Sequence, residues 1–169
     1  MGDLVVKLRR FSSEDVEGVA AVLEQAFKSL SSKKVFRRES RDGVAVNLDQ
    51  GWRLVNSAVA SGDQFPVTGP ASLIAISGAM VATFETPRDA ILLLTKQEVS
   101  EARRFLDGLD FEELVDQDSR RDVAAGGYPH PEWLKQEIVG HLEALRRLFF
   151  LAVESGDLVA KRVYAHYSA

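Results

Sequence analysis

The sequence predicts an α+β protein: a mixed β-sheet packed by about four to five helices, with a long C-terminal helix and a final strand. Strand patterns occur at both ends of the chain and in its middle. Helical patterns, with apolar residues three and four apart, fill the stretches between them. No linker or internal repeat divides the 169 residues, so we expect a single domain over residues 1–169.

The chain is expected to begin with a strand and a helix. Residues 4–11 are rich in bulky and β-branched side chains, which favours a strand. From Val16 to Leu30, apolar residues recur at helical spacing. Ser12 and Ser13 precede this stretch and can cap the helix.

The next stretch is expected to be a loop followed by a second helix. Residues 33–42 are basic and show little periodicity, so we expect a loop. Asn47 is a plausible cap for a helix over residues 48–59. Gly51 inside a helix is unfavourable by about 1 kcal/mol, which suggests that another element packs closely against it.

The middle of the chain divides into an ambiguous part and a clear part. Residues 63–89 contain several glycines and prolines and leave strand or helical turn open. Residues 90–94 are an apolar run that predicts a buried strand. Thr95 and Glu98 then form a capping box, which indicates a helix start.

The C-terminal part is predicted to be two helices and a strand. A short acidic helix is expected over about 111–118, followed by a turn at 126–131. A long helix should begin near Pro131 and end at Gly156. Its expected buried stripe consists of Leu134, Ile138, Leu142, Leu145, Phe149 and Ala152. Residues 158–167 alternate and predict the final strand.

The charge is mildly negative overall and unevenly distributed. The 21 Lys and Arg residues against 25 Asp and Glu give a formal net charge of −4, which argues against general nucleic-acid binding. Residues 33–42 carry five positive and two negative side chains, whereas residues 98–118 carry eight acids and two arginines. Two solvated surfaces are the simple interpretation. Complementary patches that steer a partner or a second copy are the alternative.

The sequence contains no recognisable catalytic motif. It has no cysteine, which excludes disulfides, thiolate metal sites and a cysteine nucleophile. The three histidines do not have metal-ligand spacing, so we expect neither a metal site nor a cofactor. No nucleophile elbow or phosphate-binding loop occurs. No signal peptide and no apolar run of about 18 residues is present, so we expect a cytoplasmic protein outside the membrane.

Five residues are candidates for a ligand site: Asp49, Trp52, Tyr128, His130 and Trp133. Asp49 and Trp52 would share a face of the second helix, where a carboxylate beside an aromatic wall could hold a cation. A core position for Trp52 and a first-turn position for Asp49 are the simpler interpretation. His130 lies between two prolines near Tyr128 and Trp133, although a rigid turn needs no site.

Several segments occur in an order and spacing shared with a known family: 48–52 (LDQGW), 70–78 (PASLIAISG), 94–99 (LTKQEV), and Tyr128-Pro129, Trp133, Leu142, Phe149-Phe150 and Gly156. Together they resemble the YfbM-like family, small bacterial proteins with no established activity. The resemblance covers nearly the whole chain and implies an α+β fold and cytoplasmic residence. It transfers no catalytic residue. At Gln50 and Ala75, the family often has lysine and arginine instead.

The leading hypothesis is a non-enzymatic protein-interaction domain, regulatory or immunity-like, because uneven surface charge occurs without a catalytic motif. The alternative is a small-molecule-binding protein or enzyme with a pocket near Asp49, Trp52, Tyr128 and Trp133. A homodimer through the last helix or the final strand is compatible with either hypothesis. We expect an unidentified protein partner, and neither a nucleic acid nor a membrane.

Overall fold

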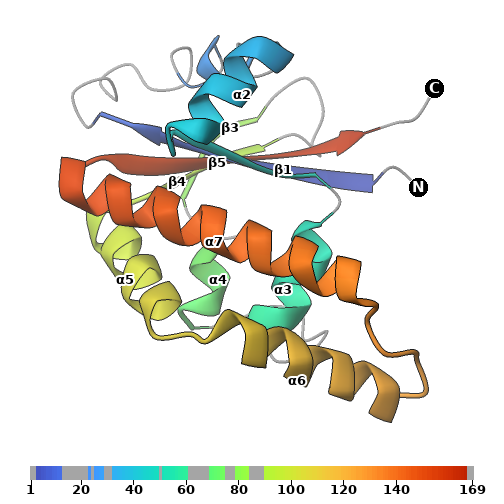
Figure 1. Cartoon of the computed structure of the whole chain (residues 1–169). Coiled ribbons are helices and arrows are strands. Elements are labelled where there is room, and N and C mark those ends of the chain that lie inside the picture. Colours follow the sequence, from blue (N-terminus) through green and yellow to red (C-terminus); the bar gives the residue numbers. More distant parts are fainter. Residues whose placement is uncertain are drawn as a thin grey trace.

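The computed structural model describes residues 3–12, 23, 25–28, 32–49, 51–60, 69–74, 79–83 and 90–166. Its strands are β1 (Asp3–Phe11), β2 (Ala45–Asp49), β3 (Ala79–Thr83), β4 (Ala90–Leu94) and β5 (Leu158–His166). Its helices are α2 (Lys33–Arg41), α3 (Trp52–Ala60), α4 (Ala71–Ile74), α5 (Lys96–Asp107), α6 (Phe111–Ala124) and α7 (Glu132–Ser155). The α+β class, the long C-terminal helix and the final strand are confirmed (Figure 1).

The strands form one sheet in the order β2-β1-β5-β4-β3. Every pairing between the described strands is antiparallel, so the expectation of a mixed sheet is wrong. The connection through α5, α6 and α7 explains the last of these pairings. It leaves the sheet after Leu94 and returns beside the same end, where Leu94 pairs with Val159. A chain that re-enters a sheet at the end it left runs antiparallel to its neighbour.

The final strand lies in the centre of the sheet. β5 pairs with β1 from Phe11↔Leu158 to Asp3↔His166, and with β4 on its other side. From Val159 to Val163, both edges of β5 are therefore occupied. Over this stretch, homodimerisation through the final strand, which the sequence left open, has no free edge to use.

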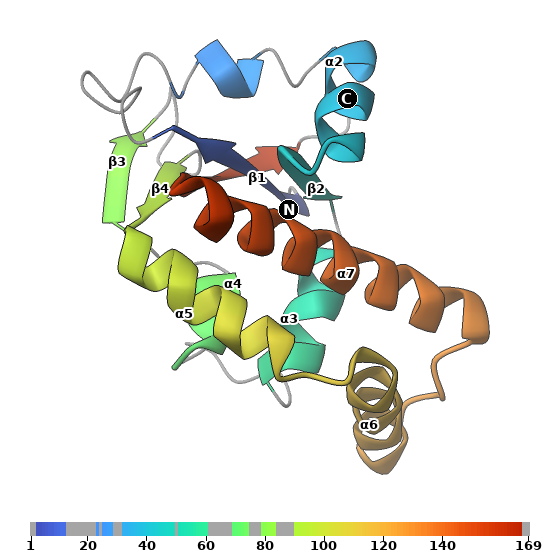
Figure 2. The same cartoon turned by 60° about the vertical axis from the view of Figure 1, so that its left-hand side comes forward.

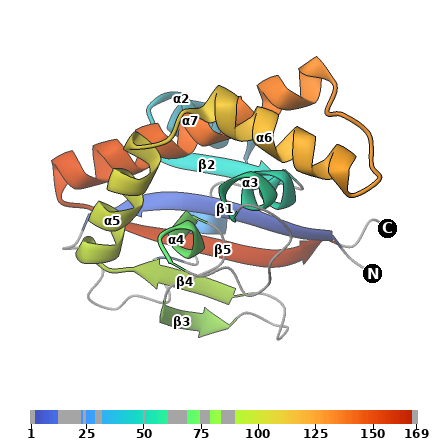
Figure 3. The same cartoon turned by 90° about the horizontal axis from the view of Figure 1, so that it is seen from below.

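Helices cover both faces of the sheet, but unequally. Figures 1 and 2 show α2 on one side and α3 to α7 on the other, and Figure 3 looks onto the latter face. The main apolar cluster lies between the sheet and α3–α7 and includes Leu8, Leu94, Val159, Leu142 and Phe149. A smaller cluster lies on the α2 side: Phe11, Leu23, Phe27, Ala45, Ile91 and Ala160.

The strongest local signals in the sequence are confirmed. Thr95 accepts a hydrogen bond from the Glu98 amide, and Glu98 accepts one from the Thr95 amide, so the capping box starts α5. Five of the six stripe residues of α7 are buried, and Leu134 is half-buried. Gly156 ends α7 in the left-handed region with φ 69°, which glycine adopts without strain.

The basic stretch predicted to be a loop is instead helix α2. Its local sequence has few apolar residues, but two tertiary contacts hold it on the sheet. Glu39 is buried and accepts two hydrogen bonds from Arg9 of β1, at 2.9 and 3.0 Å. Phe36 packs against the smaller apolar cluster. Contacts this distant in sequence override a weak local pattern.

The helix predicted over 48–59 begins later than expected. Residues 45–49 form β2, so Asn47 lies inside a strand and is not a helix cap. Leu48 and Trp52 are four residues apart, as on one face of a helix, but Leu48 belongs to the strand and Trp52 to the helix. Both pack in the main cluster, which produced the helix-like pattern. The close packing expected at Gly51 is confirmed, since a Cβ there would lie 2.8 Å from Nε2 of His141.

The remaining expectations have mixed outcomes. The short acidic helix is longer than expected and runs as α6 to Ala124. Within the ambiguous stretch, residues 71–74 form the helical turn α4 and residues 79–83 form the strand β3. The expected helix over 16–30 falls largely outside the described residues. Of that range, residues 23 and 25–28 are helical.

Candidate interaction surface

Asp49 and Trp52 do not share a helical face. Asp49 is the last residue of β2, and its side chain lies outside the described part of the structure. Trp52 begins α3 and is 6% exposed within the main cluster. The space that its ring lines with Leu48 and Val55 has no room for a water molecule. Trp52 therefore occupies the core position that the simpler interpretation assigned to it.

His130 points into the molecule, where it is anchored to α6. Its Nε2 lies 3.1 Å from Oδ2 of Asp118, and its backbone amide donates to the Ser119 hydroxyl at 2.8 Å. Oδ1 of Asp118 accepts hydrogen bonds from Ser57 of α3 and from Arg121. The network ties the α6–α7 connection to two helices. The His130 side chain is only 9% exposed and is held in this network.

Tyr128 and Trp133 are the most exposed aromatic side chains described, at 87% and 66%. Tyr128 lies on the connection that His130 anchors, and Trp133 lies in the first turn of α7. The clefts between the described residues do not bring the five candidates together in one lining. Ligand binding by these residues stays a prediction.

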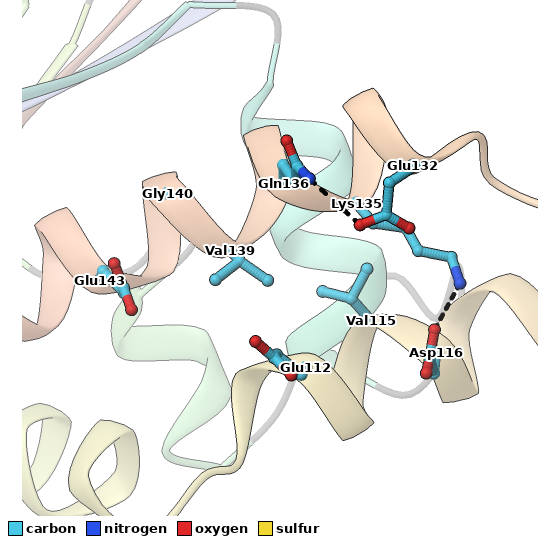
Figure 4. A pocket seen from close by; sticks show the side chains of 9 residues that line it. All are labelled: Glu112, Val115, Asp116, Glu132, Lys135, Gln136, Val139, Gly140 and Glu143. Carbon is cyan, nitrogen blue, oxygen red and sulfur yellow. Dashed lines mark hydrogen bonds and ion pairs between the residues drawn. The ribbon is translucent and has the colours of Figure 1, made fainter.

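A cleft of about 410 Å³ lies between α6 and α7 (Figure 4). Val115 of α6 and Val139 of α7 point into it and give it an apolar floor. Its charged lining residues are Glu112, Asp116, Glu132, Glu143 and Lys135. Carboxylates therefore outnumber cations in this lining four to one.

The carboxylates of the cleft differ in their partners. Lys135 donates to Asp116 and, with its positive charge, holds the pKa of that carboxyl below its usual range. Glu132 accepts a hydrogen bond from Gln136 at 3.2 Å. Glu112 and Glu143 make no hydrogen bond or ion pair with the described part of the chain, so their charges are free to face a ligand.

A second cleft continues the first toward α5. Glu112, Val139 and Glu143 line both. The second cleft adds the carboxylates of Asp107 and Asp110 and the guanidinium of Arg146. That guanidinium lies 4.0 Å from the ring centre of Phe111 and makes a cation–π contact with it. The result is an acidic groove along α6 and α7, defined by the lining residues of the two clefts.

Positive charge is concentrated on α2. Its outward face consists of Lys33, Lys34, Val35, Arg37, Arg38 and Arg41, and all five cations are exposed. Arg41 pairs with Asp42 at 3.3 Å. The inward side of α2 carries Glu39, which Arg9 neutralises. The helix therefore presents a basic face to solvent.

Lys161 of β5 is the least expected charged side chain. It is 0% exposed on the main-cluster side of the sheet, between Val159 and Val163. Burial lowers the pKa of Lys161 to about 7, and the negative charge of Glu98 opposes part of that shift. An amine with a near-neutral pKa can act as a base or nucleophile. With no exposed surface, however, this amine cannot meet a dissolved substrate in the present conformation.

Two classes of site lack support in the described residues. No group of three or more His, Asp or Glu side chains in the described ranges could hold a metal ion. Of the helices that the structure describes, none is sufficiently long and apolar to cross a membrane.

Comparisons with known proteins identify the fold. No protein-family model matches the chain, and no curated protein matches it. Among solved structures, it is similar to the crystal structure of YfbM from Escherichia coli, a protein of unknown function. The match has a TM-score of 0.63 at 15% sequence identity and covers 94% of this chain and 99% of YfbM.

The chain has the fold of YfbM. The resemblance inferred from the order of sequence segments is therefore confirmed at the level of the fold. At 15% identity, the match shows the fold alone and not a function. YfbM is itself a protein of unknown function.

Sequence reasoning found one half of the acidic groove and missed the other. The acid-rich run 98–118 contains the residues that α6 contributes. The fold shared with YfbM places Glu132, Val139 and Glu143 of α7 opposite them. A signal was present in the sequence, since these three residues follow a helical spacing on a face other than the buried stripe.

Proposed function

We propose that this chain is a bacterial, cytoplasmic interaction protein without enzymatic activity, in a regulatory or immunity-like role. Its acidic groove binds a positively charged segment of a partner protein. The observation that carries the proposal is the α6–α7 cleft. In that cleft, the carboxylates of Glu112 and Glu143 have no partner in the described chain and stand beside an apolar floor.

This lining suits lysine and arginine side chains. Their aliphatic stems can lie along Val115 and Val139 while their charged heads reach the carboxylates. Because the glutamates are exposed, each charge pair contributes modestly, and several pairs are needed for stable binding. A segment with cations on successive helical turns provides several such pairs.

Trp133 supports the same partner chemistry. It precedes Gln136 and Gly140 of the cleft lining by three and seven residues, so it lies on the adjoining flank of α7. An exposed tryptophan face attracts cations, and tryptophan is enriched in the energetic centres of protein interfaces. A partner seated in the cleft would also reach this ring.

The test is binding of a labelled synthetic peptide, measured by fluorescence anisotropy. The peptide interleaves lysine and arginine with leucine, and the reference peptide has glutamate at the basic positions. We expect the basic peptide alone to bind. The double variant Glu112→Gln/Glu143→Gln should weaken its binding by about tenfold, as two lost surface charge pairs predict.

The matched control is Glu113→Gln/Glu137→Gln, on the same two helices but outside both clefts. It removes the same net charge and should leave affinity nearly unchanged. Equal losses in both double variants would reduce the effect to overall charge and overturn the assignment to the groove. So would equal binding of the basic and acidic peptides.

A further inference from the structure

The basic face of α2 has the charge and the length that the acidic groove needs. Lys33, Arg37 and Arg41 follow one another at intervals of four residues, and Lys34 and Arg38 form a parallel row. At 1.5 Å per residue, the longer row spans about 12 Å. Within the groove, the lining of the first cleft on α7 extends from Glu132 to Glu143, which is about 16 Å by the same rise.

The basic face is held ready for binding by contacts on its inner side. Arg9 donates two hydrogen bonds to Glu39, and Phe36 packs on the smaller cluster, so α2 is fixed to the sheet. A partner that binds the outward cations meets a formed helix and does not have to order one. This lowers the entropic cost of association.

The two charged surfaces cannot meet within one molecule. α2 covers one face of the sheet, and α6 and α7 lie beyond the other (Figures 1 and 2). The sheet therefore separates the basic face from the groove. Contact between them requires two molecules, each contributing a different surface.

We infer that a second copy of this chain occupies the acidic groove, through the outward face of its α2. This assignment rests on the proposed function and names the partner of that site. Because different surfaces meet, the contact is head-to-tail, and an open assembly keeps an unused basic face at one end and an unused groove at the other. The assembly therefore grows with concentration unless it closes into a ring.

The experiment is analytical ultracentrifugation of the full chain over a range of concentrations. The average mass should rise with concentration. Raising the salt from about 0.05 M to about 0.5 M should weaken association at least tenfold, since exposed charges are screened. A mass that stays monomeric at every concentration overturns the inference.

Charge exchange tests the two surfaces directly. Lys34→Glu/Arg38→Glu lowers the charge of the basic face from +5 to +1, and Glu112→Lys/Glu143→Lys brings that of the groove from −4 to 0. Each double variant alone should self-associate at least tenfold more weakly than the wild type, because one of its two surfaces has lost most or all of its net charge. An equimolar mixture should associate again, which also shows that both variants are folded. A mixture that stays monomeric while each variant remains folded by circular dichroism overturns the inference.

The control exchange is Glu113→Lys/Glu137→Lys, outside the groove, which should leave self-association within about twofold of wild type. The peptide titration separates the two proposals. A chain that is monomeric but binds the basic peptide through Glu112 and Glu143 keeps the proposed function and loses the second copy as its partner. A monomeric chain that binds no basic peptide loses both.

Discussion

The two faces of the sheet are stabilised in different ways. Among the described residues, the face under α3–α7 buries 25 apolar side chains in one cluster, whereas the α2 face buries six. On the smaller side, a paired charge adds to the packing: Arg9 binds Glu39 and also lies 4.9 Å from the ring centre of Phe11. The large face even contains a buried lysine, Lys161.

This difference predicts which substitutions should destabilise each face most. A continuous apolar cluster loses most stability when a cavity is opened in it, because the surrounding side chains are close-packed. A helix held by few apolar contacts depends more on each polar one. The following predictions test this contrast, from the largest expected effect to the smallest.

Phe149→Ala should cause the largest loss of stability. Phe149 is fully buried in the main cluster, and truncation of a buried phenylalanine costs about 3–5 kcal/mol. Urea unfolding followed by circular dichroism measures the change. The control is Phe150→Ala on the same helix, 42% exposed and stacked by Arg103, which should lose much less. Equal losses would contradict the dominance of packing on this face.

Lys161→Met should raise stability by up to a few kcal/mol at neutral pH, because it removes a buried charge and keeps the long stem. The pKa of Lys161 is about 7 in the folded state, below its ordinary value of 10.5. Between these two pH values, the unfolded chain binds a proton that the folded chain does not. Wild-type stability should therefore rise with pH across this window.

Urea unfolding of both proteins at several pH values checks the effect. The gain from Lys161→Met should be largest at or below pH 7 and should shrink as the pH approaches 10.5. Lys96→Met, at an exposed lysine, is the control and should not reproduce the pH dependence. A gain that is constant across the window would contradict the shifted pKa.

Glu39→Gln should cost about 1–3 kcal/mol, because it leaves the Arg9 guanidinium without its charged partner. Amide hydrogen exchange should also show α2 losing protection before α5–α7. Arg41→Gln on the same helix breaks only the exposed pair with Asp42 and should cost less than about 0.5 kcal/mol. If both substitutions cost the same, the buried ion pair does not hold α2.

Thr95→Ala should have the smallest effect, about 1 kcal/mol, the usual value for a lost helix cap. It removes the hydroxyl that accepts from the Glu98 amide, while α5 keeps its packing in the main cluster. Ser100→Ala removes a hydroxyl inside α5 and is the control. A loss as large as that of Phe149→Ala would mean that the cap, and not the packing, determines this helix.

Local sequence signals predicted those elements whose stability is local. The capping box at Thr95, the long stripe of α7 and the stop at Gly156 each act within one or two turns of helix. The errors fell where distant residues decide the structure. α2 depends on Arg9, which lies 30 residues from Glu39 in sequence. At Leu48, helical spacing resulted from a strand and a helix sharing one core.

The candidate site follows the same rule. The acidic run that supplies α6 was visible as composition, but a groove requires two walls, and its α7 wall comes from residues 132–146. Similarly, nothing near Lys161 in the sequence shows that its side chain would be buried. The alternating strand pattern placed it between two valines, and only the packed helices exclude water from that face.

The central place of β5 also determines how this chain folds. Without β5, the described strands form two separate pairs, β1 with β2 and β3 with β4. The strand that joins them follows α7, and its pairing with β1 links residues as far apart as Asp3 and His166. Such long-range pairing slows folding. During synthesis, the sheet cannot close until β5 has emerged from the ribosome, and until then the apolar side of α7 must be protected in another way.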